Sequence, residues 1–341
     1  MTNTQFTQIE SALLKRVQGE VPLLPRPWDI IAQDLGVKSY QARNLITSFR
    51  EKGIIREISG ILDAASLGYN QSLVAFSLAE EHIETAGNFI ATHPGISHCY
   101  QRDDKNFNLW FTLAVSPVSQ LGLEKTIEIL VKKTSAERFL ILPTLKKFKL
   151  AVCFDFATGS INSPVAETSS PKIVYDYTKL NLDALRALQQ DLPAIEQPFQ
   201  KLADEAKLSR DNFLRLAQEL KTAGVLRRYS AVMHHRKTGA NSNVMVVWNL
   251  PADHIEIAAV RAAQNKSVSH CYTRPVSENW QFGLYTMIHG KSPEDCLQTI
   301  NEIAAQIGNP PNRKLWTKAE FKKARVKFFS EDEKIWEDNN L

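Results

Sequence analysis

The chain contains the same unit twice. Residues 53–68 read GIIREISGILDAASLG, and residues 224–239 read GVLRRYSAVMHHRKTG. Residues 96–102, ISHCYQR, return at 268–274 as VSHCYTR. Both pairs are 171–172 residues apart and occur in the same order. A repeat of this length indicates two copies of a complete set of domains and excludes a solenoid of short repeats.

Each copy opens with two helices around a short turn. Apolar residues recur at helical spacing in PWDIIAQDLGVKSYQARNLITSFREKGII, with a break at residues 34–37. Ser39 suits a helix start and Gly53 a C-terminal stop. The second copy, FQKLADEAKLSRDNFLRLAQELKTAGVL, repeats the pattern with Ser209 and Gly224. Two helices followed by a short strand predict a winged helix-turn-helix.

Strands and helices then alternate. In the first copy we expect strands at SLVAFSL, ISHCYQRD, NLWFTLAV and FKLAVCFDF, and helices at EHIETAGNFIAT and VSQLGLEKTIEILVKK. In the second copy the strands are NVMVVWNL, VSHCYTRP, FGLYTMIHG and ARVKFF, and the helices are DHIEIAAVRAAQ and SPEDCLQTINEIAAQ. The order β-α-β-β-α-β predicts an α+β, ferredoxin-like domain with its helices on one face of the sheet. We expect the sister copy to cover the open face.

A change of composition separates the copies. From about Asp155 to Asp176 the chain is rich in Ser, Thr, Pro and Ala and shows no periodicity, which is typical of a linker. We therefore predict a helix-turn-helix domain over 1–68, a ferredoxin-like domain over 69–156 and a linker over 157–176. The second helix-turn-helix and ferredoxin-like domains are expected over 177–239 and 240–341.

Charge and composition exclude several classes of protein. The 41 basic and 37 acidic residues give a net charge of +4, too small to indicate a dedicated nucleic-acid or membrane-surface protein. No apolar run approaches the roughly 18 residues of a membrane helix, and no signal peptide is visible. We expect a cytoplasmic protein. The four Cys have neither CxxC nor metal-ligand spacing, so we predict no disulfide framework, zinc site or iron–sulfur cluster.

Two short runs place chemically useful side chains on one face of a strand. His98, Tyr100 and Arg102 alternate, and so do their counterparts His270, Tyr272 and Arg274. Side chains of these types need hydrogen-bond partners when they are buried, so they are poorly suited to a dry core. The pattern suits a pocket for an anionic ring, and it equally suits a polar sheet face satisfied by the sister copy. His289 either lines the same pocket or only ends its strand.

A basic cluster occurs in one copy only. Arg227 and Arg228 precede four consecutive residues, His234, His235, Arg236 and Lys237. The matching positions of the first copy are Asp63, Ala64, Ala65 and Ser66. This difference predicts one working site, centred on the second half, and one degenerate site. The alternative is a solvated basic loop after the wing strand.

These motifs resemble two related families. A helix-turn-helix joined to a ferredoxin-like domain resembles the Lrp/AsnC regulators. The segments VQGEVPLLPRPW, HPGISHCYQRDDKNFNLWFTL, GVLRRYSAVMHHRKTGANSNVMVVW and SVSHCYTRPVSENWQFGLYTMIHG resemble the siroheme decarboxylases, over nearly the whole of both halves. The HHRK run with two SHCYxR runs is the most specific part of this resemblance. Two paired subunits of that family look fused here into one chain.

The resemblance implies the reaction. Siroheme would lose CO2 from two acetate side chains, giving 12,18-didecarboxysiroheme for heme d1 or alternative heme biosynthesis. No redox step and no cofactor beyond the iron tetrapyrrole substrate is implied. The substrate and the pairing of the two halves are the expected partners, whereas DNA and membrane are not. Further homo-oligomerisation is left open.

Site roles follow from the chemistry of these residue types. Histidine exchanges protons near neutral pH, and the arginine fork binds carboxylates bidentately. The expected catalytic residues are His234, His235, Arg236 and His270. The expected substrate-binding residues are His98, Tyr100, Arg102, Arg227, Arg228, Lys237, Tyr272 and Arg274. His270 or His98, and next His235, are the candidates for an axial ligand of the substrate iron.

Two other functions fit parts of the sequence. A ligand-responsive regulator needs groups that read bases on the second helix of each helix-turn-helix. The first copy offers Lys38, Gln41, Arg43 and Asn44, and the second offers Arg210, Asp211, Asn212 and Arg215. Two dissimilar copies would read DNA asymmetrically, which disfavours this function. A heme-binding protein without catalysis would need the same pocket but not the HHRK run.

Overall fold

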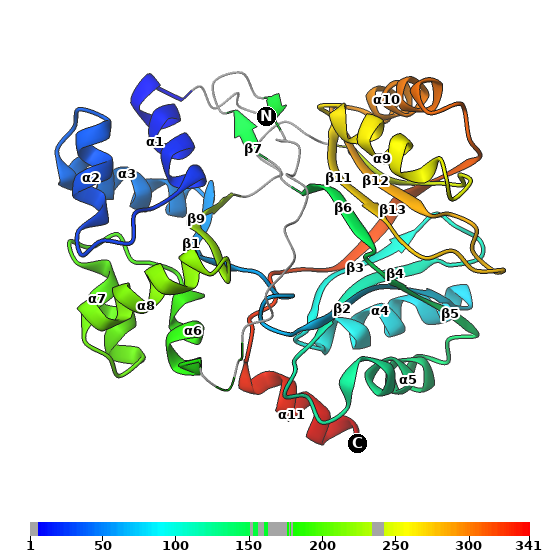
Figure 1. The fold of residues 1–341 in the computed structure, drawn as a ribbon, viewed down its shortest axis with the longest axis horizontal. Coiled ribbons are helices and arrows are strands. Elements are labelled where there is room, and N and C mark those ends of the chain that lie inside the picture. The colour runs from blue at the N-terminus through cyan, green and yellow to red at the C-terminus, as the bar shows by residue number, and fades with distance from the viewer. Residues whose placement is uncertain are drawn as a thin grey trace. The chain divides into compact units, whose positions relative to one another are not determined.

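Two compact units make up the chain, and each takes one part from each copy. The computed structural model describes residues 6–150, 153–155, 160–162, 176, 178, 180–233 and 242–341. One unit comprises Met1–Leu67, Phe154–Ser160 and Ile173–Gly239, and the other Gly68–Cys153, Ile161–Lys172 and Ala240–Leu341 (Figure 1). The helix-turn-helix parts of both copies therefore share one unit, and the ferredoxin-like parts share the other.

The helix-turn-helix unit takes helices and a wing strand from each copy. The first copy supplies α1 (Gln8–Gly19), α2 (Pro27–Asp34), α3 (Ser39–Glu51) and β1 (Ile55–Leu62). The second supplies α6 (Leu182–Leu188), α7 (Pro198–Glu205), α8 (Arg210–Thr222) and β9 (Leu226–Met233). Ser209 is the N-cap of α8, as predicted, and accepts a hydrogen bond from the Asn212 amide. Helices α1 and α6 were not expected from the sequence.

The two wing strands pair with each other. β1 and β9 form an antiparallel two-stranded sheet in which Ser59 lies opposite Ser230. Asp191, from the second copy, accepts hydrogen bonds from the Ile58 amide at 2.7 Å and from Arg50 at 2.7 Å. Main-chain pairing thus joins the two copies within this unit.

The ferredoxin-like unit has the predicted order of elements. The first copy supplies β2 (Asn70–Ser77), a 3-10 turn (Glu80–His82), α4 (Ile83–Thr92), β3 (Ile96–Arg102), β4 (Leu109–Val115), α5 (Gly122–Thr134), β5 (Arg138–Pro143) and β6 (Lys146–Leu150). The second supplies β10 (Ser242–Trp248), α9 (Ile255–Gln264), β11 (Val268–Thr273), β12 (Leu284–Gly290), α10 (Pro293–Gln306), β13 (Asn312–Lys323) and α11 (Glu331–Asn340). Strands β7 (Cys153–Asp155) and β8 (Ser160–Asn162) form a separate pair.

The closing strands differ from the prediction. ARVKFF, residues 324–329, is not a strand; β13 ends before it, at Lys323. In the first copy β5 was missed, and the predicted strand at 148–156 overlaps only the end of β6 and the short β7. Strand β13 is largely polar and only partly buried, so it lacks the apolar alternation by which the other strands were found.

The last strand of each copy pairs with a strand of the other copy. The nine-stranded order is β5-β2-β4-β3-β13-β10-β12-β11-β6. Residues 312–316 of β13 pair with β10 of their own copy, and residues 317–323 pair with β3 of the first copy. Likewise, β6 of the first copy pairs with β11 of the second. The exchange binds the two halves of this unit by main-chain hydrogen bonds.

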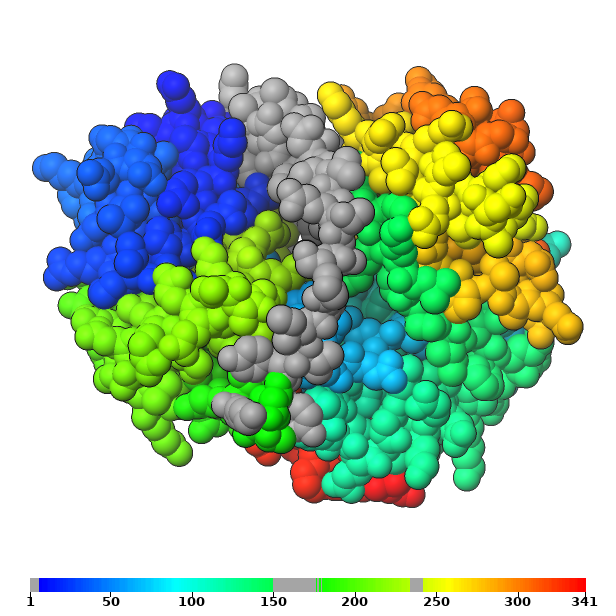
Figure 2. All heavy atoms as spheres, viewed as in Figure 1, coloured from blue at the N-terminus to red at the C-terminus, as the bar shows by residue number. Residues whose placement is uncertain are grey.

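The two copies' halves of this sheet also pack face to face, as expected. On β2, Val74 and Phe76 belong to the apolar cluster under helices α4 and α5. The alternate residue Leu73 belongs to a second cluster, together with Met245 and Val247 of the second copy. Because alternate strand residues point to opposite faces, this second cluster is the layer between the two halves of the sheet. Figure 2 shows the two copies' parts of this unit in continuous contact on the face in view.

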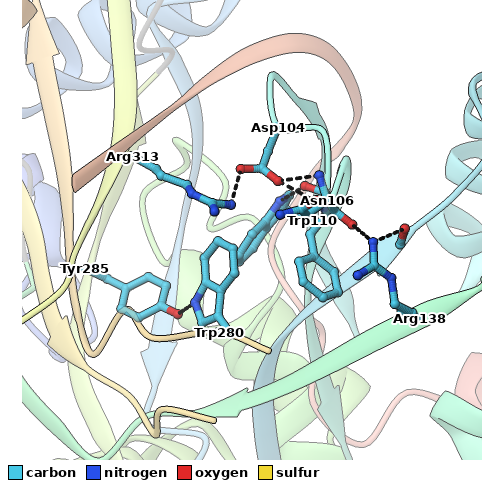
Figure 3. Close-up of polar contacts among 9 residues, drawn as sticks. Asp104, Asn106, Trp110, Arg138, Trp280, Tyr285 and Arg313 are labelled. Atoms are coloured by element: carbon cyan, nitrogen blue, oxygen red, sulfur yellow. Dashed lines mark hydrogen bonds and ion pairs between the residues drawn. The ribbon is translucent and has the colours of Figure 1, made fainter. Parts of the chain in front are cut away.

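Polar contacts link the copies at one end of this layer (Figure 3). Trp280, from the β11–β12 connection, donates through Nε1 to the Tyr285 hydroxyl at 2.6 Å. Its ring lies 5.4 Å from that of Trp110, of the first copy. Arg313 lies over the Trp280 ring and forms an ion pair of 3.1 Å with Asp104, again of the first copy. The Arg313–Asp104 ion pair and the Trp110–Trp280 contact thus join the two copies.

Candidate active site

The predicted His-Tyr-Arg sets lie on equivalent strands, β3 and β11. Cys99 and Cys271, which alternate with them, are fully buried in the apolar clusters on the helix side. The intervening residues therefore point to the opposite face, as the alternation predicted. Four of them, His98, Tyr100, His270 and Tyr272, are half-buried.

Both sets have the same local geometry. The ring centroids of His98 and Tyr100 are 6.0 Å apart, and those of His270 and Tyr272 are also 6.0 Å apart. The arginine at the end of each run lies over the ring of its tyrosine, at 4.9 Å for Arg102 and 5.4 Å for Arg274. The His, Tyr and Arg side chains therefore keep the same arrangement in both copies.

The two arginines are buried beneath the tyrosines. Arg102 donates through Nη1 to the Leu315 carbonyl at 3.2 Å and to the Thr317 hydroxyl at 2.6 Å. Arg274 donates to the Leu142 carbonyl. Burial lowers the pKa of Arg102 to about 10, so its guanidinium is still charged at neutral pH. With exposures of 4% and 8%, these side chains offer little surface to a substrate carboxylate, and the predicted clamp remains a prediction.

Each histidine is hydrogen-bonded to the serine before it. The Ser97 hydroxyl lies 2.9 Å from Nδ1 of His98, and the Ser269 hydroxyl lies 2.8 Å from Nδ1 of His270. Both strands have a register shift at this point, which brings consecutive side chains together. The second hydroxyl also contacts Nε2 of His289 at 2.8 Å. Sequence reasoning missed the contact of Ser269 with two histidines.

The exchanged strands give the two sets different charges, because the first set faces both Glu320 and Lys323 of β13 and the second faces Lys147 of β6. Glu320 of β13 lies opposite Tyr100, whereas Lys147 of β6 lies opposite Tyr272. Directly opposed residues of antiparallel strands share a face, so each charge accompanies its tyrosine. The second set therefore offers the more favourable surroundings for an anionic ligand. Sequence reasoning missed Lys147 because it belongs to the other copy.

The predicted basic cluster is only partly described. His234, His235, Arg236 and Lys237 lie outside the described residues. Arg227 and Arg228 lie on β9, in the helix-turn-helix unit, where Arg227 is exposed and Arg228 is half-buried. The His-Tyr-Arg sets belong to the ferredoxin-like unit.

The described residues contain few other candidate sites. Among them, no group of three or more His, Cys, Asp or Glu side chains could hold a metal ion. Cys99, Cys271 and Cys296 are free and buried, and burial raises the pKa of Cys99 and Cys271 to about 12. A shallow hollow on the helix-turn-helix unit, beside α7, contains none of the predicted site residues. No helix in the described part of the chain is long and apolar enough to cross a bilayer.

One residue that could contact DNA bases in the second helix-turn-helix already has partners within the protein. Arg210, at the start of α8, forms hydrogen bonds to Asp211 at 2.9 Å and to Gln197 at 2.9 Å. Its charge is therefore partly neutralised within the protein. This contact weakens the DNA-reading alternative in the second copy.

Two protein families match the chain, each once in each copy. A family described as AsnC-like ligand binding domain matches residues 66–149 and 237–322. A family described as siroheme decarboxylase NirDL-like HTH domain matches residues 10–56 and 183–227.

Relatives match over the full length. The siroheme decarboxylase of Hydrogenobacter thermophilus is 36% identical over 328 residues, covering 95% of this chain and 96% of the relative. A crystal structure of the siroheme decarboxylase NirDL superposes with a TM-score of 0.78 and 32% identity, over 98% of both chains. A structure of siroheme decarboxylase NirDL in co-complex with an iron-uroporphyrin III analogue matches equally well. The chain therefore belongs to the siroheme decarboxylase family of carboxy-lyases, in its single-chain form with two AsnC-like domains in tandem.

Proposed function

We propose that this chain converts siroheme to 12,18-didecarboxysiroheme by non-oxidative loss of CO2 from two acetate side chains. The product would serve heme d1 or alternative heme biosynthesis, and no cofactor beyond the iron tetrapyrrole substrate is required. The observation that carries this proposal is the half-buried pair of His270 and Tyr272 on β11, with Lys147 opposite the tyrosine. The family relationship supports it.

The substrate is a flat ring that carries many carboxylates. A tyrosine ring offers it a flat apolar contact and a hydroxyl, and a lysine offers a cation for one carboxylate. Tyr272 and Lys147 provide both on neighbouring strands. Arg227, Arg228 and Lys237 are retained as substrate-binding candidates on sequence grounds.

The chemical step needs one proton for each acetate. Breaking the bond between the side-chain CH2 and the carboxylate releases CO2, and the electron pair left behind is delocalised into the macrocycle. A proton then forms the new C–H bond of the methyl group. His270 suits this role because an imidazole exchanges protons near neutral pH. A positioned general acid typically contributes about 10²–10⁴ in rate.

The other predicted roles remain part of the proposal. His234, His235 and Arg236 are retained as catalytic candidates on sequence grounds. The axial ligand of the substrate iron is expected at His98 or His270, and next at His235. A histidine that ligates iron cannot donate the proton at the same time, so these two roles fall to different residues or to different stages.

Mass spectrometry of the extracted tetrapyrrole tests the proposal. Purified protein is incubated anaerobically with siroheme, without any added cofactor. Loss of two CO2 units supports the decarboxylase. Siroheme that stays bound and unchanged would contradict it and would identify a non-catalytic heme-binding protein. If the protein neither binds nor converts siroheme, the transcription regulator becomes the leading function.

A further inference from the structure

Each exchanged strand carries a lysine on the helix side of the sheet. Lys149 lies on β6 opposite Cys271, and Lys322 lies on β13 opposite Cys99. Both cysteines are buried in the apolar clusters under the helices, and directly opposed strand residues share a face. Lys149 is only 1% exposed, and Lys322 is half-buried. A buried lysine needs acceptors for its ammonium group, because an unpaired buried charge is costly.

Both ammonium groups bind the end of a helix that belongs to the sister copy. Nζ of Lys149 donates to the carbonyl of Asn265, the C-cap of α9, at 2.8 Å. Nζ of Lys322 donates to the carbonyls of Ala91 and His93, at the end of α4, at 2.7 Å and 2.8 Å. The last carbonyls of a helix carry partial negative charge, so a cation is favourable there. A lysine from one copy thus caps a helix of the other.

In the second copy the capped carbonyl also begins the turn into β11. The Asn265 carbonyl accepts the Val268 amide at 3.2 Å, and the Asn265 Oδ1 accepts the Ser267 amide at 2.9 Å. Val268 is the first residue of β11, and His270 is the third. The register of β11 against β12 shifts between these two residues. Lys149 therefore binds the turn from which the backbone reaches the histidine.

The first copy has the same turn. The His93 carbonyl accepts the Ile96 amide at 3.1 Å, and the His93 Nδ1 accepts the Gly95 amide at 3.0 Å. Ile96 begins β3, and the register shift of that strand falls between Ile96 and His98. The two lysines thus bind equivalent turns, and they differ in which histidine follows. This difference allows an effect on the site to be separated from an effect on stability.

We propose that Lys149 is a positioning residue for the decarboxylase site of the second copy, an inference that rests on the proposed function. Its hydrogen bond to the end of α9 fixes where β11 begins, and this sets where the His270 side chain meets the substrate. Because β6 belongs to the first copy, the site of the second copy is complete only when the strands have been exchanged. A displacement of about 1 Å in a reacting group can lower the rate about 10²-fold.

A purely structural role is the competing explanation. Lys149→Met keeps most of the apolar length of the side chain but removes its ammonium group. Lys322→Met makes the same change beside the turn that leads to His98. If the lysines only stabilise helix ends, both variants lower the urea midpoint of unfolding, and neither lowers kcat of the folded protein. A positioning role lowers kcat only where the capped turn leads to the working histidine.

Steady-state kinetics with siroheme tests the proposal, at a temperature at which urea titration shows each variant to be folded. Lys149→Met is the main variant, and Asn265→Ala removes a side-chain acceptor from the same turn. Lys322→Met is the equivalent change in the first copy. Lys146→Met removes an exposed lysine from the same strand, β6, and is the matched control. Iron uroporphyrin is titrated into each variant as a separate probe of binding.

We expect Lys149→Met to lose about tenfold or more in kcat, while KM and the Kd for iron uroporphyrin stay within about threefold. Asn265→Ala, the milder change, should lose about threefold or more, and Lys322→Met and Lys146→Met should stay within about twofold of the wild-type kcat.

Two results would overturn the proposal while leaving the decarboxylase intact. One is a wild-type kcat in folded Lys149→Met, and the other is a loss of kcat in Lys322→Met as large as that in Lys149→Met. If Lys149→Met does not fold, Asn265→Ala decides, and a wild-type kcat in that variant refutes the positioning role. Wild-type protein that does not decarboxylate siroheme would instead refute the proposed function.

Discussion

The strand exchange can be tested at Phe148. This residue lies on β6, in the first copy, yet its side chain is 8% exposed within the apolar cluster of the second copy. Its neighbours in that cluster include Val244 and Trp248 of β10 and Ala259 of α9. We expect Phe148→Ala to destabilise the ferredoxin-like unit because it leaves a cavity at the junction of the two copies.

The size of the effect follows from burial. Truncating a buried phenylalanine to alanine typically lowers the free energy of unfolding by about 3–5 kcal/mol. Domains are stable by only about 5–15 kcal/mol, so the loss is a large share of the total. Phe139, on β5, is 45% exposed and provides the control. Phe139→Ala should lower the free energy of unfolding by less than about 1 kcal/mol.

Equilibrium unfolding in urea, followed by circular dichroism and tryptophan fluorescence, measures both variants. Because the exchanged strands link both copies, we expect the two ferredoxin-like halves to unfold in one transition, which Phe148→Ala moves to lower urea. A loss below about 1 kcal/mol for Phe148→Ala, no larger than the control, would show that β6 does not occupy the core of the second copy. A separate transition for each half would refute the exchange as well.

Two further substitutions test contacts within the same unit. Burial raises the pKa of Glu333 to about 7, so the stability that its protonated form contributes is complete below about pH 4.5 and is lost as the pH rises through 7. Glu333→Gln keeps an acceptor for the Ser116 amide. At pH 8 this variant should be more stable than the wild-type protein by about 1–2 kcal/mol, after allowance for partial exposure. Identical urea midpoints for the two proteins from pH 5 to pH 8 would contradict this. Arg102→Met should lower the free energy of unfolding by about 1–3 kcal/mol, because the Leu315 carbonyl loses its buried donor. A clamp on the substrate would also require a higher KM for siroheme in this variant, and an unchanged KM would remove that role.

Much of the architecture could be predicted from local patterns. The duplication, the helix-turn-helix parts and the β-α-β-β-α-β order all follow from periodicity and from the repeat itself. The alternation at His98 and His270 correctly placed each set on one face, because the period of a strand is fixed by its geometry. Residues 234–241, where the basic cluster was found, lie outside the described residues, and its role remains a prediction.

The exchange of strands could not be predicted in the same way. Which strand pairs with β3 or β11 depends on tertiary packing, and the polar sequence of β13 carries no local signal for its partners. The predicted strand at 324–329 is more apolar than much of β13, and this misled the assignment. Sequence reasoning also missed that Lys147 lies opposite Tyr272 and that His289 contacts Ser269, for a related reason. One comes from the other copy, and the other depends on a register shift in β11.

The most direct test of the central claim compares His270→Ala with wild-type protein in a single turnover. Each is mixed anaerobically with less than one equivalent of siroheme, and the tetrapyrrole is extracted at intervals and weighed by mass spectrometry. We expect wild-type protein to remove two CO2 units. His270→Ala should bind the substrate but decarboxylate it about 10²–10⁴ times more slowly. Loss of both CO2 units from His270→Ala at the wild-type rate would contradict the assignment of the working site to the second copy's histidine.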